Sequence, residues 1–123
     1  MAVLSTAPAL ATVLTLVALE LAANLTGRWS VALDPGFADN PITMMCDLTQ
    51  DGRELTLECD DVPVVEGTLD GQAVKFVIMT GRDNLLPARF SGILEAGDTV
   101  IRGTWRLEDT TGNRIGRFRA EKK

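Results

Sequence analysis

The stretch of sequence that decides the fold is ITMMCDLTQDGRELTLEC, residues 42–59. Apolar and polar residues alternate on both sides of Asp51-Gly52, and Asp-Gly is a favoured two-residue turn between antiparallel strands. A turn at this dipeptide predicts three inward pairs: Leu48 with Leu55, Cys46 with Leu57, and Met44 with Cys59. The opposite face carries polar side chains: Thr43, Asp47, Thr49, Glu54, Thr56 and Glu58. The segment is therefore predicted to form a hairpin with one buried face.

Two further turns, at Asp70-Gly71 and Ala96-Gly97, repeat this pattern. They predict four more inward pairs: Gly67 with Val74, Val65 with Phe76, Gly92 with Ile101, and Phe90 with Gly103. Alternation along the chain adds further inward residues: Trp29, Val31, Leu33, Ile42, Leu69, Ile78, Leu94, Trp105, Leu107 and Phe118. Because none of these side chains is ionisable, the three hairpins predict one shared apolar interior.

About eight strands are expected from the alternating segments and the turn residues between them. Their predicted ranges are Thr26–Leu33, Ile42–Gln50, Arg53–Cys59, Val64–Leu69, Gln72–Thr80, Ala88–Glu95, Asp98–Leu107 and Arg114–Glu121. Consecutive hairpins without a crossover favour a barrel over a two-sheet sandwich. The predicted fold is all-β: an eight-stranded antiparallel up-and-down β-barrel over residues 25–123, preceded by one N-terminal helix.

The predicted connections alternate in length. Tight turns follow the second, fourth and sixth strands, whereas longer loops span residues 34–41, 60–63, 81–87 and 108–113. In an up-and-down barrel, alternate connections lie at opposite ends. The barrel is therefore expected to have a mouth, where the long loops gather, and a floor formed by the tight turns.

Residues 1–24 contain an almost wholly apolar run that fits two interpretations. The first interpretation is a retained amphipathic helix, because Thr6 is a suitable N-cap, Pro8 fits the first helical turn and Asn24 can end a helix. A secretory signal peptide is the other, although no Lys or Arg precedes Arg28. The run is short for a membrane span. The first interpretation implies a cytoplasmic protein, and the second a secreted or periplasmic one.

Composition and charge exclude several functions. The chain has 123 residues, which suits one domain, and its net charge of -5 with a pI near 4.6 disfavours nucleic acid as a partner. Basic residues do gather near the C-terminus, at Arg114, Arg117, Arg119, Lys122 and Lys123, where strand alternation predicts a solvated face. The chain has no histidine and no CxxC motif, so no metal or other cofactor is expected.

The segment Leu25-Thr26-Gly27-Arg28-Trp29 is similar to the opening strand of avidins, and Gly-x-Trp to that of lipocalins. Gly116-x-Phe118-x-Ala120 is similar to a closing strand of the same group. The chain thus resembles the calycins, a group of ligand-binding barrels, over residues 25–123. The resemblance implies a ligand-holding barrel in which Arg117 or Arg119 packs on Trp29. It transfers no biotin site, because the chain has no tyrosine.

The inward face offers apolar contacts and little chemistry. Cys46 and Cys59 are expected to lie diagonally across one hairpin as free, unreactive thiols, and no base accompanies them. A disulfide between them in an oxidising compartment is the alternative, with a less suitable geometry. The residues predicted to line a binding site are Leu33, Phe37, Ile42, Met44, Cys59, Val65, Phe76, Ile78, Phe90 and Trp105. Phe37 and Leu85-Leu86 are expected on the rim as gates. An eight-stranded barrel either holds one small ligand or fills itself with side chains, and both outcomes stay open here.

Three functions follow from this interior. The first is binding of a small hydrophobic molecule, and the second is a cyclase or isomerase that acts on an apolar substrate by shape and desolvation. The third is a structural or interaction protein with a packed core. Outward apolar residues are expected to pair across two hairpins, Val64 with Val77 and Ile93 with Val100, and Met79 lies nearby. This stripe is expected to be covered by the N-terminal helix or by a second subunit in a homo-oligomer.

Overall fold

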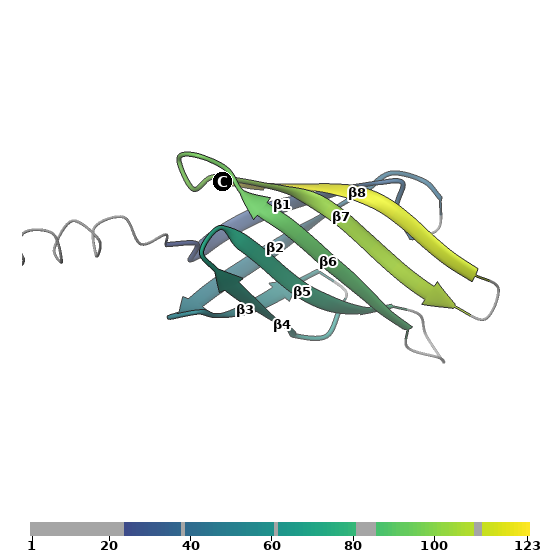
Figure 1. Cartoon of the computed structure of the whole chain (residues 1–123), viewed down its shortest axis with the longest axis horizontal. Helices are drawn as coiled ribbons and strands as arrows, with labels where there is room; N and C mark the ends of the chain where they lie inside the picture. Colours follow the sequence, from purple (N-terminus) through teal and green to yellow (C-terminus); the bar gives the residue numbers. More distant parts are fainter. Residues whose placement is uncertain (1–23, 38, 61, 81–85, 110–111) are drawn as a thin grey trace, which may run out of the picture.

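Eight antiparallel strands close into a barrel in a computed structural model that describes residues 24–37, 39–60, 62–80, 86–109 and 112–123 (Figure 1). The strands are β1 (Gly27–Asp34), β2 (Ile42–Asp51), β3 (Glu54–Cys59), β4 (Val65–Asp70), β5 (Ala73–Thr80), β6 (Leu86–Leu94), β7 (Val100–Asp109) and β8 (Gly112–Lys122). The predicted all-β class and strand count are confirmed. The predicted N-terminal helix and the rim residue Leu85 lie outside the described residues.

Strand order follows the sequence around the whole barrel. Each strand pairs with the next, and β1 closes the sheet by pairing with β8, with Leu33 opposite Phe118 and Val31 opposite Ala120. Closure removes the unpaired sheet edges that an open arrangement of the same strands would expose. The up-and-down topology is therefore confirmed, and a sandwich is excluded.

The register of the three tight hairpins differs from the prediction by two residues. Cys46 pairs with Cys59 and Leu48 with Leu57, while Gly67 pairs with Phe76 and Gly92 with Gly103. The predicted pairings of Leu48 with Leu55, Cys46 with Leu57, Met44 with Cys59, Gly67 with Val74, Val65 with Phe76, Gly92 with Ile101 and Phe90 with Gly103 are wrong. A two-residue shift preserves the inward and outward faces, because the side-chain period of a strand is two.

Turn geometry explains the shift in the first two of these hairpins. Asp51 pairs with Glu54 and Asp70 with Ala73, so the turns are Gly52-Arg53 and Gly71-Gln72. Gly52 and Gly71 have φ values of 63° and 61°, whereas the residues after them do not have positive φ. This is the type II′ pattern, with glycine at the first turn position, rather than the predicted type I′ pattern.

The long connections gather at one end, with one correction. The described parts of residues 35–41 and 60–64 link successive strands at the mouth, and β5 ends and β6 begins at the same end. The predicted long loop over residues 108–113 is wrong, because Glu108 pairs with Asn113 and Asp109 with Gly112 in β7 and β8. These two strands extend together beyond the mouth (Figure 1).

Apolar side chains pack the interior, and they are mostly the ones that the alternation of apolar and polar residues predicts to point inward. Trp29, Trp105, Phe90 and Leu33 are among the largest of the fully buried side chains. Ile42 is the exception to the predicted inward set, since its side chain is 38% exposed. It lies at the first position of β2, beside the loop residue Gly36, and is therefore at the rim.

Candidate functional site

An aromatic cluster fills the barrel below the mouth. Phe76 and Phe90 stack with ring centroids 4.6 Å apart, and Phe118 meets both rings edge-on at 5.8 and 5.2 Å. Gly92 makes room for this cluster, because a Cβ atom there would lie 2.8 Å from the Phe118 ring. The three rings come from β5, β6 and β8, so separate parts of the chain build one layer.

Phe37 closes this cluster from above. It lies in the connection between β1 and β2, and its half-buried ring meets Trp105 at 5.1 Å and Phe90 at 6.2 Å. Both contacts are edge-on, with interplanar angles of 82° and 84°, which is a favourable geometry for aromatic pairs. The ring of Phe37 therefore acts as a plug at the mouth.

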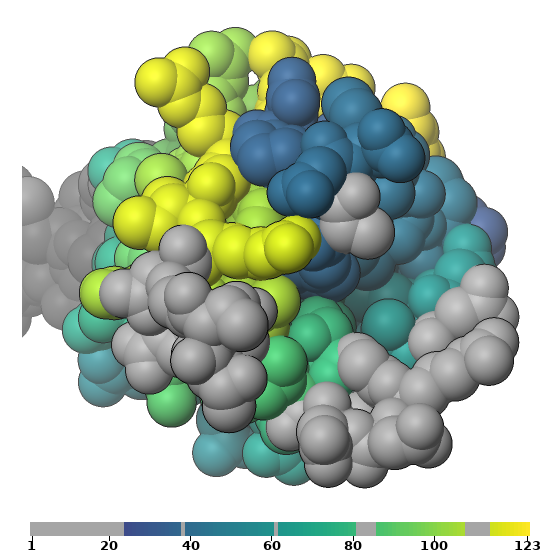
Figure 2. All heavy atoms as spheres, turned by 90° about the vertical axis from the view of Figure 1, so that its right-hand side faces the viewer, coloured from purple at the N-terminus to yellow at the C-terminus, as the bar shows by residue number. Residues whose placement is uncertain are grey.

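Polar contacts hold the loop that carries the plug. The indole Nε1 of Trp105 donates to the carbonyl oxygen of Pro35 at 3.0 Å. Nη1 of Arg114 donates to the carbonyl oxygen of Phe37 at 2.7 Å and lies 3.3 Å from the carboxylate of Asp39. Figure 2 shows the dark blue loop against the yellow strand β8 at this end. Since Arg114 and Asp39 are exposed, solvent competes with this part of the attachment.

The opposite end is closed more firmly. The side chain of Leu25 is completely buried, its N–H donates to Oε1 of Gln50 at 2.8 Å, and its carbonyl oxygen accepts from Trp29 Nε1 at 2.8 Å. Satisfying these backbone groups removes the cost of burying them. The floor is therefore sealed by Leu25, and access to the interior is easier at the mouth.

The two cysteines form a disulfide, so the expected free thiols and the diagonal arrangement are wrong. Cys46 and Cys59 lie directly opposite each other with Cα atoms 4.0 Å apart, and both side chains are buried. The two-residue register shift is the physical reason, since it converts a diagonal pair into a facing pair. The bond joins β2 to β3 and removes both thiols from the chemistry of the interior.

Seven of the predicted site residues are buried inside the barrel: Leu33, Cys59, Val65, Phe76, Ile78, Phe90 and Trp105. Phe37 and Met44 are half-buried, while Ile42 is at the rim. The rim residue Leu86 packs against the core. Within the described ranges, no charged or polar side chain is buried and no group of three metal-ligating residues occurs. These side chains therefore offer an apolar contact surface.

Lys122, rather than an arginine, lies opposite Trp29 of the first strand. Trp29 pairs with Lys122 in the register of β1 and β8, and Nζ of Lys122 donates to the carbonyl oxygen of Asn24 at 3.3 Å. Arg117 and Arg119, which the calycin resemblance implied, are exposed on the outer wall. The implied packing of either arginine on Trp29 is therefore not formed.

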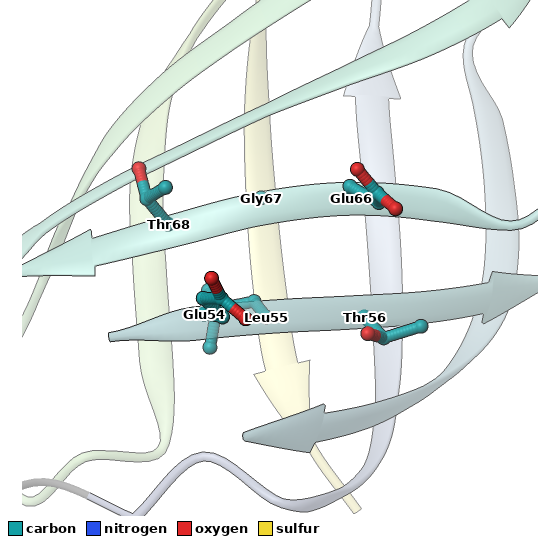
Figure 3. A pocket seen from close by; sticks show the side chains of 6 residues that line it. All are labelled: Glu54, Leu55, Thr56, Glu66, Gly67 and Thr68. Carbon is teal, nitrogen blue, oxygen red and sulfur yellow. The ribbon is translucent and has the colours of Figure 1, made fainter. Parts of the chain in front are cut away.

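The outer wall holds hollows that sequence reasoning missed. One of about 360 Å³ lies between β3 and β4 and is lined by Glu54, Leu55, Thr56, Glu66, Gly67 and Thr68 (Figure 3). The outward side chains of Glu54, Thr56, Glu66 and Thr68 surround this hollow, and Leu55 and Gly67, whose positions face the interior, lie at its base. The glycine inside a strand was the available signal.

The predicted outer apolar stripe is interrupted. Val64 and Ile93 are 62% and 54% exposed, while Val77, Met79 and Val100 are half-buried. Ile93 faces Arg102 rather than Val100, and the register of β4 and β5, with Gly67 opposite Phe76, does not bring Val64 opposite Val77. The predicted pairs of Val64 with Val77 and of Ile93 with Val100 are therefore wrong. The outer surface is therefore organised by charge more than by apolar contact.

Comparisons of the chain with protein-family models, curated proteins and solved structures gave no match. Among the described residues, no helix is long and apolar enough to cross a membrane.

Proposed function

We propose that this protein is a calycin-type barrel that binds one small, flat, neutral apolar molecule at its mouth, in the space that the Phe37 ring fills. The observation that carries the proposal is that a loop, and not a strand, supplies the ring of Phe37. Strands supply the aromatic cluster beneath it, whereas a surface loop supplies Phe37 itself. A loop side chain can leave this position without breaking the barrel, and an aromatic ligand can then make the same contacts.

Burial and charge define the class of ligand. A charged ligand would lose its hydration without gaining a counter-charge, because the described side chains around Phe37, Phe90 and Trp105 include no buried ionisable group. A neutral ring gains the edge-on contacts that Phe37 now makes. The interior therefore favours neutral, aromatic-sized molecules.

Trp105 supplies a directional contact. When the loop that carries Phe37 moves away, the indole N–H of Trp105 loses its hydrogen bond to the carbonyl oxygen of Pro35. It then becomes a free donor at the edge of the site. A buried donor without a partner costs about 1–3 kcal/mol, so the site favours a ligand that carries one acceptor, such as a ketone or ether oxygen. The same interior gives no general acid or base for the cyclase or isomerase alternative among the described residues.

The test uses 2-acetylnaphthalene, a flat neutral ketone, and reads the fluorescence of the two tryptophans in a chain without tyrosine. If the open loop is populated at about 10% or less, removing the plug with Phe37→Ala strengthens binding about tenfold or more. Trp105→Phe, which keeps an aromatic ring but removes the donor, weakens binding to the Phe37→Ala protein. Ile115→Ala, an exposed change on the outer wall, is the matched control and leaves binding unchanged.

Absence of saturable binding to both the wild type and Phe37→Ala, with the barrel still folded by circular dichroism, contradicts the proposal. Binding that is insensitive to Phe37 and Trp105 contradicts it as well, because the probe then sits elsewhere.

A further inference from the structure

Charge is segregated on the outside of the barrel. The strands β2, β3 and β4 contain six acidic residues and no lysine or arginine: Asp47, Asp51, Glu54, Glu58, Glu66 and Asp70. The strands β6, β7 and β8 contain six arginines and one lysine against three acidic residues. The outer faces of these two sets are called the carboxylate wall and the arginine wall below. The net charge of -5 conceals this division.

The two walls face in opposite directions. In the closed order of the barrel, the central strands β3 and β7 are separated by three strands on either side. The strands β1 and β5 lie between the walls. A molecule that binds a neighbour through one wall therefore leaves the other wall free.

Each wall places like charges directly opposite each other. Asp47 faces Glu58 and Asp51 faces Glu54, while Arg89 faces Arg106 and Arg102 faces Arg119. Such cross-strand pairs destabilise a sheet relative to neutral pairs. This arrangement works against the stability of the isolated barrel and is relieved by a surface of opposite charge.

Relief within the molecule is partial. Arg102 pairs with Glu95 at 2.9 Å, and Arg119 pairs with Glu121 at 2.7 Å. Across the part of the chain that the structure describes, Arg89 and Arg117 on one wall and Glu54 and Glu66 on the other form no ion pair. All four side chains are exposed and free to meet a partner.

The walls also complement each other in shape. Glu54 and Glu66 flank the hollow of about 360 Å³ between β3 and β4 (Figure 3). The arginine wall carries long exposed side chains, and Ile115 among them is 63% exposed. A guanidinium group that enters the hollow can reach a carboxylate in the bidentate geometry that arginine favours.

We propose that the arginine wall of one molecule docks on the carboxylate wall of a second copy of this chain. One chain carries both complementary surfaces, so a second copy can satisfy both sets of unpaired charges, whereas a polyanion satisfies only one. Because the walls are on opposite sides, the contact is heterologous and repeats into side-by-side rows. The mouth stays uncovered, so this inference is independent of the proposed ligand site.

The test is sedimentation velocity of the folded chain over a range of concentrations and salt. At about 0.1 M salt the Debye length is about 10 Å, so facing walls outweigh the repulsion between net charges. We expect a concentration-dependent series of oligomers whose apparent Kd rises about tenfold or more between about 0.05 and 0.5 M NaCl.

Two charge-reversal variants give the decisive comparison. Arg89→Glu with Arg117→Glu removes the net positive charge of the arginine wall, and Glu54→Lys with Glu66→Lys reduces the negative charge of the carboxylate wall. Each variant alone is expected to be monomeric. An equimolar mixture regains association, because the first variant retains the native carboxylate wall and the second retains the native arginine wall. Lys75→Glu, on β5 between the walls, is the control: it shifts the net charge in the same direction as the first variant, and it retains association.

A wild type that is monomeric at every concentration and salt tested overturns the proposal. So does a mixture of the two variants that stays monomeric while circular dichroism shows both to be folded. If the wild type stays monomeric yet binds a heparin column through Arg89 and Arg117, the arginine wall serves a polyanion and the second-copy proposal is wrong.

Discussion

Reduction of the Cys46–Cys59 bond gives the clearest test of how this barrel is stabilised. The bond joins residues 13 apart in sequence and crosses one hairpin between β2 and β3. Reduction leaves both sulfur atoms in place, so the packing of the interior changes little. The measured effect is then the entropy that the cross-link removes from the unfolded chain.

The expected loss follows from the loop length. A closed loop of about 15 residues contributes about 3 kcal/mol at 25 °C in the chain-entropy model. For a domain of about 100 residues, each kcal/mol corresponds to about 4–8 °C in Tm, so reduction lowers Tm by about 12–24 °C. Because total stabilities of small domains are about 5–15 kcal/mol, the reduced protein is expected to remain folded at room temperature.

The assay is urea unfolding followed by tryptophan fluorescence, with and without reductant, because both Trp29 and Trp105 are buried. The Cys46→Ala, Cys59→Ala double variant is the control, since reductant does not change its midpoint. A loss below about 1 kcal/mol on reduction of the wild type refutes the reasoning, because a cross-link that restricts the unfolded chain must cost more when removed.

Three further predictions test the packing at the floor, the wall and the mouth. Gly116→Ala drives a Cβ atom into the Trp105 indole and is expected to cost about 1–3 kcal/mol by thermal unfolding, and an unchanged Tm would contradict this contact. Leu25→Ala leaves a cavity under the floor and is expected to cost about 2–5 kcal/mol in urea, with a loss below about 1 kcal/mol showing that Leu25 does not seal the barrel. Arg114→Ala is expected to change the free energy of unfolding by less than about 1 kcal/mol, because the contacts of Arg114 are exposed. It is also expected to accelerate amide hydrogen exchange at Gly36 and Asp39 in the mouth loop. Equal exchange rates in the variant and the wild type would contradict the attachment of this loop by Arg114.

The faces of the strands were predictable from sequence because they depend only on the parity of the alternation. Leu55, Leu57 and Cys59 point inward whether the turn begins at Asp51 or at Gly52. The register was not predictable in the same way, because Asp-Gly suits a type I′ turn whereas glycine at the first position suits a type II′ turn. The error over the cysteines follows directly from this ambiguity, since two residues of register separate a diagonal pair from a facing pair.

The plug at the mouth depends on contacts that alternation does not encode. Phe37 was a predicted gate because it lies in a long loop beside an apolar interior. Its position over the aromatic cluster, however, is set by Trp105, which bonds to Pro35 at a separation of 70 residues. Local patterns give no information at that range, so the sequence identified the gate residue but not what it covers.

The disulfide also bears on the conditions in which the barrel is most stable. Disulfides form and persist in oxidising compartments, and reducing compartments keep most thiols free. The buried bond between Cys46 and Cys59 is therefore expected to stabilise the barrel wherever conditions are oxidising. In that setting a cross-link of about 3 kcal/mol is a large share of the stability of a small domain. The cross-link stabilises the barrel itself, so the barrel stays closed even though exposed, weak contacts hold part of the mouth loop.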